Sequence, residues 1–427
     1  MENSRTQIED ENFKNQHRKT AQDFTRTRSL PFALVLVLIL RKSVKSLQNI
    51  VNEATTWLEQ KPVSGSAYSQ ARHKLKHTAF IDLNQTAIVN TMYSDDQYQK
   101  FWGFRVLAVD GSKIVLPDNR NVREEFGTIA WSNKAGEIQG ERPYAVASVL
   151  YDVLNRIALD ATLGKAKAYE VDLGVAHLAH TQAGDLLTLD RNYPSYRMLA
   201  EMMQYGRDFV ARCSAASFTA ARQMLKGEGA DSQIITLTPC AEQLPVIKQL
   251  NLPLSLTLRF VRVRLNTGEY EVLVTSLLDE FLYPTTEFAP LYHLRWGIET
   301  FYGLLKTRLE LENFTGTGVE TIKQDFYATV YLSGLESLLT DAAQAQLDAK
   351  KTQYPQKVNR AVSFNAIKNQ ALDLLFSDMP IDPLLEKLTA LFLCNPCLER
   401  TNRNPPRKKS SARVLLNFHK RHKKHCF

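Results

Sequence analysis

Residues 291–316, LYHLRWGIETFYGLLKTRLELENFTG, form the stretch on which the prediction of the fold depends. An α-helix, at about 100° per residue, places four polar side chains of this stretch within an arc of about 60°: Tyr292, Arg295, Glu299 and Lys306. Four apolar side chains cluster on the other side: Leu294, Ile298, Phe301 and Leu305. The pattern predicts one amphipathic helix that packs through its apolar side and leaves an acid, two cations and a phenol free.

The polar face has two interpretations. Arg295 and Glu299 could form an ordinary surface pair at i, i+4, worth a few tenths of a kcal/mol, beside a solvated Tyr292 and Lys306. Alternatively, the acid and its flanking cations could serve a phosphate backbone and a metal ion. Two aspartates elsewhere in the chain favour the second interpretation.

Each of these aspartates follows a predicted strand. Residues 105–109, RVLAV, predict a short buried strand that ends at Asp110, and residues 185–189, DLLTL, predict a second that ends at Asp190. Ligand sites in α/β sheets gather beyond the carboxyl ends of strands. Either aspartate alone could be a turn residue, but two such positions together with Glu299 predict a functional site.

The segment between these two strands predicts a hairpin and a helix. Residues 144–151 and 156–163 have the composition of two paired strands, and residues 168–182 have a helical pattern. His177 and His180 lie at helical spacing in that segment, and we predict a structural role for them.

A β-rich insertion is predicted between the second aspartate and the glutamate, because the 108 residues between Asp190 and Glu299 exceed what one connection needs. The apolar alternation of residues 254–265 shifts phase at Phe260 and Val261, which predicts a bulge. We expect a small antiparallel sheet within residues 201–285. Three arginines of its hairpin could face DNA or could deter edge aggregation: Arg259, Arg262 and Arg264.

The N-terminal region is predicted to be helical over residues 24–93. A short helix at residues 66–75 carries Arg72, His73 and Lys74, so the region is compatible with a helix-turn-helix-like DNA-binding module. A plain helical cap on the next domain is the alternative. The apolar run 30–40 has 11 residues, fewer than the roughly 20 that a membrane span needs, and we predict a buried helix.

The charge of the chain is concentrated in its last residues. The formal net charge of the 427 residues is +8, and residues 400–427 alone hold ten Lys or Arg and no acid, which leaves −2 for the rest. Clustered cations of this kind predict a nonspecific DNA contact, with a solvated tail as the alternative. Five scattered cysteines and a polar N-terminus predict a reduced, cytoplasmic protein.

A zinc site near the C-terminus is an alternative interpretation of its cysteines and histidines. Cys394 and Cys397 form a C-x2-C pair that precedes three histidines and a cysteine: His419, His422, His425 and Cys426. The 21-residue gap and the histidine spacing fit known zinc patterns poorly.

The chemistry of the main site follows from its donors. Asp110, Asp190 and Glu299 would provide only hard oxygen ligands, which favour Mg²⁺ or Mn²⁺ over zinc. Two such ions about 3.5 to 4 Å apart can activate a water or a sugar hydroxyl and stabilise the leaving oxygen in phosphoryl transfer. Arg295 and Lys306 would hold phosphates nearby.

The chain resembles the DDE transposases of bacterial insertion sequences, in particular the insertion sequence four family. The resemblance rests on the spacing Tyr292-x2-Arg295-x3-Glu299-x6-Lys306 and on DGS at 110–112, DRNY at 190–193 and RWGIE at 295–299. It extends from about residue 24 to 409.

This resemblance implies an α/β fold with a ribonuclease H-like catalytic core, formed by residues 96–200 and 286–346 and interrupted by the β insertion at 201–285. It also implies an N-terminal helical DNA-binding domain at 1–95 and a helical, basic C-terminal region at 347–427. Asp110, Asp190 and Glu299 would be the metal ligands, with two Mg²⁺ or Mn²⁺ ions per site.

The implied reaction is cut-and-paste transposition, in which the protein nicks DNA at the element's ends, forms a hairpin and joins the ends to target DNA. Four residues of this stretch would contact the DNA: Tyr292, Arg295, Trp296 and Lys306. An aromatic residue of the insertion could stack on a flipped base, for which Phe260 and Tyr270 are candidates. The partners would be double-stranded DNA, at terminal inverted repeats and target, and a second copy of the chain on paired ends, without a membrane.

Two other functions are compatible with the pattern. The protein could be a sequence-specific DNA-binding protein without catalysis, although intact acids at all three positions argue against this. It could also be a metal-dependent nuclease that cleaves DNA but never joins ends.

Overall fold

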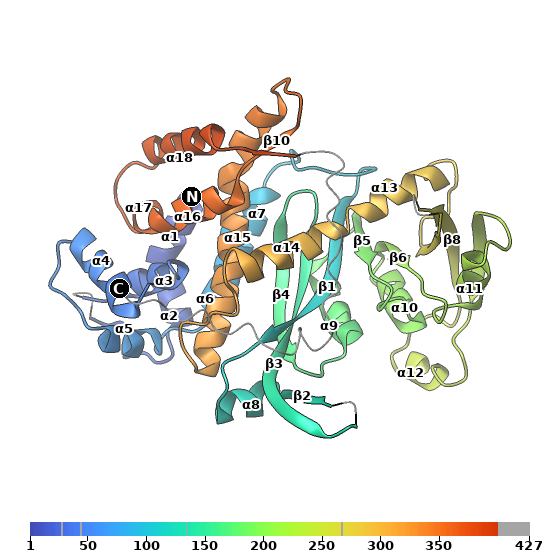
Figure 1. Cartoon of the computed structure of the whole chain (residues 1–427), viewed down its shortest axis with the longest axis horizontal. Helices are drawn as coiled ribbons and strands as arrows, with labels where there is room; N and C mark the ends of the chain where they lie inside the picture. Colours follow the sequence, from blue (N-terminus) through green and yellow to red (C-terminus); the bar gives the residue numbers. More distant parts are fainter. Residues whose placement is uncertain (27–28, 43–44, 134, 266–267, 400–427) are drawn as a thin grey trace. The chain divides into compact units, whose positions relative to one another are not determined.

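A computed structural model describes residues 1–26, 29–42, 45–133, 135–265 and 268–399 (Figure 1). The basic tail lies outside these residues, together with the histidines and Cys426 of the possible zinc site. The chain divides into two compact units, a helical unit of Met1–Ser94, Val115–Tyr144 and Leu304–Phe427 and a sheet unit of Asp95–Ile114 and Ala145–Gly303. No helix within the described ranges is long and apolar enough to cross a membrane.

The sheet unit is built on one mixed sheet, and the predicted α/β class is confirmed. The strands are β1 (Arg105–Val115), β3 (Ile138–Asp152), β4 (Ile157–Lys165), β5 (Asp185–Leu189), β6 (Asp208–Arg212), β7 (Ser232–Leu237), β8 (Leu256–Arg264) and β9 (Tyr270–Thr275). Their order in space is β3-β1-β5-β6-β9-β8-β7, with β4 paired to β3. β1, β5 and β6 are parallel, and β9, β8 and β7 follow in antiparallel pairing.

The predicted strands are found, with changes in their extent and grouping. The hairpin of β3 and β4 is confirmed. The β-rich insertion does not form a sheet of its own, because β6 pairs in parallel with β5 and thereby joins β7, β8 and β9 to the sheet of the two aspartates.

The predicted bulge in β8 is wrong. Its register runs without a shift against both β7 and β9. Leu258, Arg259, Phe260 and Val261 are all fully buried. The apolar alternation is lost at this point because both faces of the strand are covered, not because the backbone is irregular.

Helices of the sheet unit pack on the strands and connect them. These are α9 (Glu170–His177), η2 (Leu178–His180), α10 (Tyr196–Gln204), α11 (Thr219–Leu225), α12 (Leu244–Gln249), η3 (Thr285–Glu287), α13 (Phe288–His293) and the start of α14 (Trp296–Thr307). α13 docks through Phe288, Leu291 and Tyr292 onto a core that includes Val106 and Leu186. The helices α11 and α12 were not predicted.

The helical unit is built around the long helix α15 (Val319–Asp348) (Figure 1). Its other elements are α1 (Glu2–Glu9), α2 (Glu11–His17), α3 (Phe32–Leu40), α4 (Leu47–Trp57), α5 (Gly65–Arg72), α6 (Thr78–Leu83), η1 (Asn84–Val89), α7 (Asn90–Met92), α8 (Arg120–Phe126), β2 (Thr128–Ser132), β10 (Gln356–Lys357), α16 (Arg360–Asn369), α17 (Ala371–Leu375), α18 (Asp382–Cys394) and β11 (Cys397–Leu398). β2 pairs with the first half of β3, and β10 pairs with β11. The apolar run of α3 is buried against α15, as predicted.

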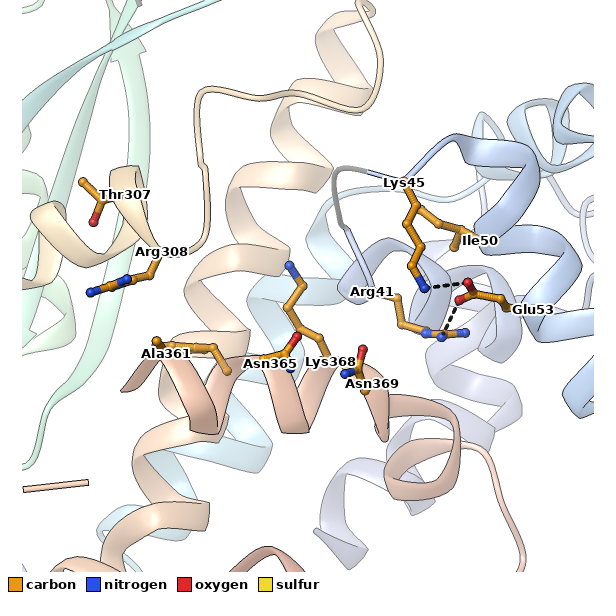
Figure 2. Close-up of a pocket in the computed structure, with 11 residues that line it drawn as sticks. Arg41, Lys45, Ile50, Glu53, Thr307, Arg308, Ala361, Asn365, Lys368 and Asn369 are labelled. Carbon is orange, nitrogen blue, oxygen red and sulfur yellow. Dashed lines mark hydrogen bonds and ion pairs between the residues drawn. The ribbon is translucent and has the colours of Figure 1, made fainter. Parts of the chain in front are cut away.

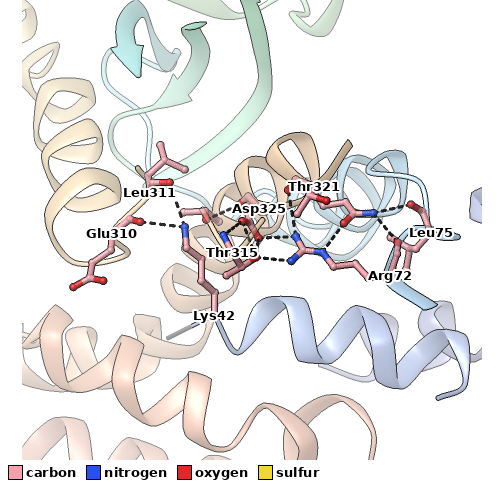
Figure 3. A network of polar contacts seen from close by, with 10 residues as sticks. Lys42, Arg72, Leu75, Glu310, Leu311, Thr315, Thr321 and Asp325 are labelled. Atoms are coloured by element: carbon pink, nitrogen blue, oxygen red, sulfur yellow. Dashed lines mark hydrogen bonds and ion pairs between the residues drawn. The ribbon is translucent and has the colours of Figure 1, made fainter. Parts of the chain in front are cut away.

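A buried polar network fixes α5 to α15 in this unit (Figure 3). Arg72 pairs with Asp325 at 2.8 Å and donates to the Gln324 amide oxygen at 2.7 Å. Burial alone would raise the pKa of Asp325, but Arg72 and Lys42 hold it below its usual range. Lys42 donates to the carbonyls of Glu310 and Leu311, and its burial lowers its pKa to about 8. Arg72 is therefore a structural residue and is not available to contact DNA.

Candidate active site

The register of β1 and β5 brings the two predicted aspartates side by side. Val109 pairs with Leu189 in the last step of the parallel ladder, so Asp110 and Asp190 leave neighbouring strands, about 4.8 Å apart, at equivalent positions. β1 itself continues to Val115, so Asp110 lies inside a strand and not at its end as predicted. The pairing of β1 with β5, however, ends at Val109, the residue before Asp110.

Both aspartates accept a hydrogen bond from the backbone that follows them. The Gly111 N–H donates to Asp110 Oδ1 at 2.8 Å, and the Arg191 N–H donates to Asp190 Oδ1 at 2.6 Å. The second oxygen of each carboxylate is not part of these bonds. Each aspartate therefore makes the hydrogen bond expected of a turn residue, and this bond is compatible with a role in a site.

The glutamate comes from α14, which is not continuous with the helix before it. α13 ends at His293 and α14 begins at Trp296, so the predicted single helix is two helices. Leu294, Arg295, Gly297 and Ile298 donate to carbonyls three residues earlier, and these i→i−3 bonds tighten the chain at the junction. α14 ends at Thr307, before the predicted end at Gly316.

Arg295 lies at this junction and holds Glu299. Its Nη2 donates to Glu299 Oε1 at 2.8 Å, while its side chain is only 3% exposed and that of Glu299 is 40% exposed. The guanidinium carbon lies 5.5 Å from the centre of the Tyr292 ring and 5.3 Å from that of Trp296. Its Nε is buried without a hydrogen-bond partner in the described part of the chain.

The three acids share one electrostatic environment. Burial raises the pKa of Asp110 to about 6, and the charges of Asp190 and Glu299 add to the rise. The Gly111 N–H and the positive charge of Arg295 oppose it. Asp110 therefore experiences the charge of both other predicted acids, as a shared site requires.

The predicted free polar face is wrong for two of its members. Tyr292 is 4% exposed, and its hydroxyl donates to the Leu189 carbonyl at 3.3 Å, next to Asp190. Arg295 is buried as described above. Trp296 is 36% exposed, and Lys306 is half-buried near the end of α14, where burial lowers its pKa. DNA contact by Tyr292, Arg295, Trp296 and Lys306 stays a prediction. The predicted apolar side is confirmed at Ile298, Phe301 and Leu305, which are buried.

Tyr302 and Gly297 fix α14 against the strands. The Tyr302 hydroxyl lies 2.9 Å from the Asp110 carbonyl and 2.8 Å from the Ala147 carbonyl, so it bridges β1 and β3. A Cβ on Gly297 would lie 3.2 Å from the Val153 side chain, so glycine permits the close approach of the helix to the β3–β4 hairpin. Glu299 lies one turn before Tyr302 on the same helix, so the contacts of Tyr302 and Gly297 with the strands also position Glu299 relative to Asp110.

Two residues of this region were missed by the sequence analysis. Glu170, in the first turn of α9, lies beside Asp110, since a Cβ on Gly111 would lie 3.4 Å from its Oε1. Tyr193 of the DRNY motif is 1% exposed, its hydroxyl has no hydrogen-bond partner among the described residues, and burial together with Asp110, Glu170 and Asp190 raises its pKa. The acid in the first turn after the hairpin was the available signal for Glu170.

The donor set suits a divalent cation. The carboxylates supply hard oxygen donors, and the pKa of Asp110 is raised mainly by burial and further by the negative charges of Asp190 and Glu299. Among residues 1–26, 29–42, 45–133, 135–265 and 268–399, however, no three His, Cys, Asp or Glu side chains lie close enough to hold a metal ion. An ion bound by Asp110, Asp190 and Glu299 would thus have to draw their carboxylates closer together.

The family described as transposase DDE domain matches residues 102–332, more than half of the chain and a range that contains all three acids. The chain belongs to this family. The match supports the predicted DDE transposase class, while assignment to the insertion sequence four family stays a prediction.

Other comparisons add little to the family assignment. Among solved structures, the transposase is similar to a piggyBac transposase in a synaptic complex with hairpin DNA, at 9% sequence identity and a TM-score of 0.42. The similarity covers 97% of this chain and 84% of that one. No curated protein matches the transposase.

Other predicted contacts of the transposase turn out to be structural. Arg259 is fully buried and donates to Ser232, Thr285 and the Tyr283 carbonyl. Arg262 pairs with Asp231 at 2.6 Å. These two arginines stabilise the sheet, so neither is available for the DNA contact that was one of the two alternatives for this hairpin. Phe260 is also fully buried, which removes it as a candidate for stacking on a base, whereas Tyr270 is 37% exposed.

The histidines and cysteines also have defined surroundings. His177 is buried between Asp160, at 2.6 Å, and the Ser148 hydroxyl, at 2.9 Å, so its predicted structural role is confirmed. Cys394 and Cys397 are exposed free thiols. The zinc hypothesis stays open because its other ligands lie outside the described residues.

Proposed function

We propose that this transposase cuts DNA at the ends of an insertion sequence and joins them to target DNA, with Asp110, Asp190 and Glu299 as catalytic acids. The observation that carries the proposal is the register of β1 and β5, which places Asp110 beside Asp190 where the charge of Glu299 also reaches. The family match over residues 102–332 supports the reaction class.

We further propose a ribonuclease H-like core, supported by the parallel strands β1, β5 and β6 and the β3–β4 hairpin beside them. The spacing of Tyr292, Arg295, Glu299 and Lys306 supports membership of the insertion sequence four family. That membership implies a hairpin intermediate and a dimer on paired ends.

Each residue of the site would have a separate role in the reaction. Two Mg²⁺ or Mn²⁺ ions held by the three carboxylates would activate the attacking water or 3′-hydroxyl and stabilise the leaving oxygen. Arg295 keeps Glu299 in one orientation through its hydrogen bond, and its guanidinium is itself held by cation–π contacts with the rings of Tyr292 and Trp296. Tyr302 keeps α14 at a fixed distance from the strand of Asp110.

The test uses DNA that carries the sequences flanking the gene. Wild-type protein with Mg²⁺ should nick this DNA, and Glu299→Gln should reduce the rate by at least about a hundredfold, because loss of a charged ligand removes several kcal/mol of transition-state stabilisation. Glu124→Gln, an exposed acid on α8, is the matched control and should cut normally.

The products separate the alternatives. Joined ends identify a transposase, whereas cleavage without joining identifies a nuclease. Binding without any cleavage by the wild type would overturn the catalytic proposal and leave a DNA-binding protein.

A further inference from the structure

A second site candidate lies in the helical unit, in a cavity of about 250 Å³. Its walls come from the end of α3, from α4, from the residues at the end of α14 and from α16 (Figure 2). Six of its lining residues determine its chemistry: Arg41, Lys45, Glu53, Arg308, Asn365 and Lys368.

The cavity has more positive than negative charge. Among the described residues that line it, four side chains are cationic and Glu53 is the one carboxylate. Glu53 is already shared between Arg41, at 3.2 Å, and Lys45, at 2.6 Å. Three positive charges in excess remain on one small concave surface, an arrangement that favours an anion.

Two of the cations have no partner of their own among the described residues. The side chains of Lys368 and Arg308 form no hydrogen bond or ion pair with any residue that the structure describes, and Figure 2 shows Lys368 extending from α16 between Arg308 and the Arg41–Glu53–Lys45 group. Burial lowers the pKa of Lys368, with Glu310 opposing, and Lys368 in turn lowers the pKa of the nearby Lys42. Arg41 also has a buried Nη1 without a hydrogen-bond partner in the part of the chain that the structure describes.

We propose that this cavity binds a phosphate group, supplied by the backbone of the DNA on which the transposase acts. Lys368 would act as a point charge, Arg308 would offer a planar fork for two phosphate oxygens, and the Asn365 amide can add a hydrogen bond. The assignment to DNA rests on the proposed function. A free phosphorylated ligand would use the same chemistry, and the experiment distinguishes the two sources.

The experiment measures binding of the full chain to duplex DNA in EDTA, where no cleavage takes place. Lys368→Gln and Arg308→Gln should each weaken binding about tenfold at about 50 mM salt. Each should also reduce the slope of log K against log salt by about 0.9, the value for one lost phosphate contact. Lys387→Gln, an exposed lysine on α18 outside the cavity, removes the same charge and should leave the affinity within about twofold.

A second measurement tests the free ligand and the folding of the variants. Calorimetric titration of inorganic pyrophosphate into the full chain should show no binding if DNA is the source. Pyrophosphate binding that Lys368→Gln abolishes, with unchanged DNA affinity, would assign the cavity to a free phosphorylated ligand and overturn the DNA contact. Because removal of one cation relieves repulsion, neither variant should lower the melting temperature, and the exposed Arg308 provides the safer variant.

Unchanged DNA affinity and salt slope in both variants, without pyrophosphate binding, would overturn the proposal entirely. These outcomes are independent of catalysis. If Glu299→Gln and wild type cut equally poorly while the cavity variants still lose DNA affinity, the proposed function fails and the phosphate site stands.

Discussion

At the scale of single residues, the structure changes the role that the sequence suggests for Arg295. Its spacing from Tyr292 and Glu299 is compatible with a side chain that faces DNA, yet it is 2% exposed and holds Glu299 at 2.8 Å. A planar guanidinium can stack between two aromatic rings and donate a directed hydrogen bond at the same time. Arg295 thus orients the proposed third metal ligand.

The replacement Arg295→Lys tests this role. Lysine keeps the charge but loses the planar stacking and the fixed direction of the donor, so Glu299 should become misplaced. We expect the rate of DNA cleavage to fall by about a hundredfold, the typical effect of displacing a catalytic group by about 1 Å. DNA affinity in EDTA should change little.

A matched control exists for this replacement. Arg120 and Glu124 form a pair of the same i, i+4 spacing at 2.8 Å, with the Arg120 side chain 88% exposed. Arg120→Lys should leave the cleavage rate unchanged. If both arginine variants cleave like wild type, Arg295 does not position the glutamate.

At the scale of elements, α5 shows that a cationic side chain of a helix can serve to pair with a buried acid of the same protein and not to bind DNA. Arg72, at its last turn, is used within the helical unit, where Asp325 of α15 is fully buried and needs a cation. The same guanidinium contacts Thr315 and the Thr321 carbonyl. α5 is therefore attached to α15 by a charged network and not only by apolar packing.

Removal of Arg72 alone should lower the free energy of unfolding far more than removal of Arg72 and Asp325 together. Arg72→Met leaves Asp325 buried without its main partner and should lower the free energy of unfolding by about 3 to 5 kcal/mol. The double variant Arg72→Met, Asp325→Leu should recover most of this loss. Denaturant unfolding checks both values, and a double variant as unstable as the single one would contradict the account.

At the scale of the whole molecule, the proposed catalytic acids and the excess of positive charge lie in different parts of the sequence. The three proposed acids lie within residues 110–299, whereas the formal net charge of +8 arises from the ten cations of residues 400–427. A cationic segment of this kind attracts DNA without regard to sequence, because binding releases counterions from the phosphates.

Deletion of residues 400–427 should therefore flatten the salt dependence of DNA binding. The slope of log K against log salt should decrease by about 0.9 for each phosphate that the segment neutralises. Affinity measured in EDTA from about 50 to 200 mM salt checks this. A slope equal to that of the full chain would show that the segment does not contact DNA.

Much of the fold could be predicted from local pattern. The apolar runs before Asp110 and Asp190 mark β5 and the paired part of β1, and turn residues mark the β3–β4 hairpin. The break between α13 and α14, the burial of Arg295 and the inclusion of β6 to β9 in the main sheet could not be predicted. These features depend on which surfaces cover one another, and the sequence of a single segment does not contain that information.

The shared register of β1 and β5 also limits where insertions and deletions can be tolerated. Successive strand residues point to opposite faces, so one residue inserted or deleted between Arg105 and Asp110 would turn Asp110 away from Asp190. The turn at residues 227–231, between α11 and β7, is exposed and imposes no such alternation. Length variation among functional descendants should therefore accumulate in such turns and be excluded from the five residues that precede Asp110.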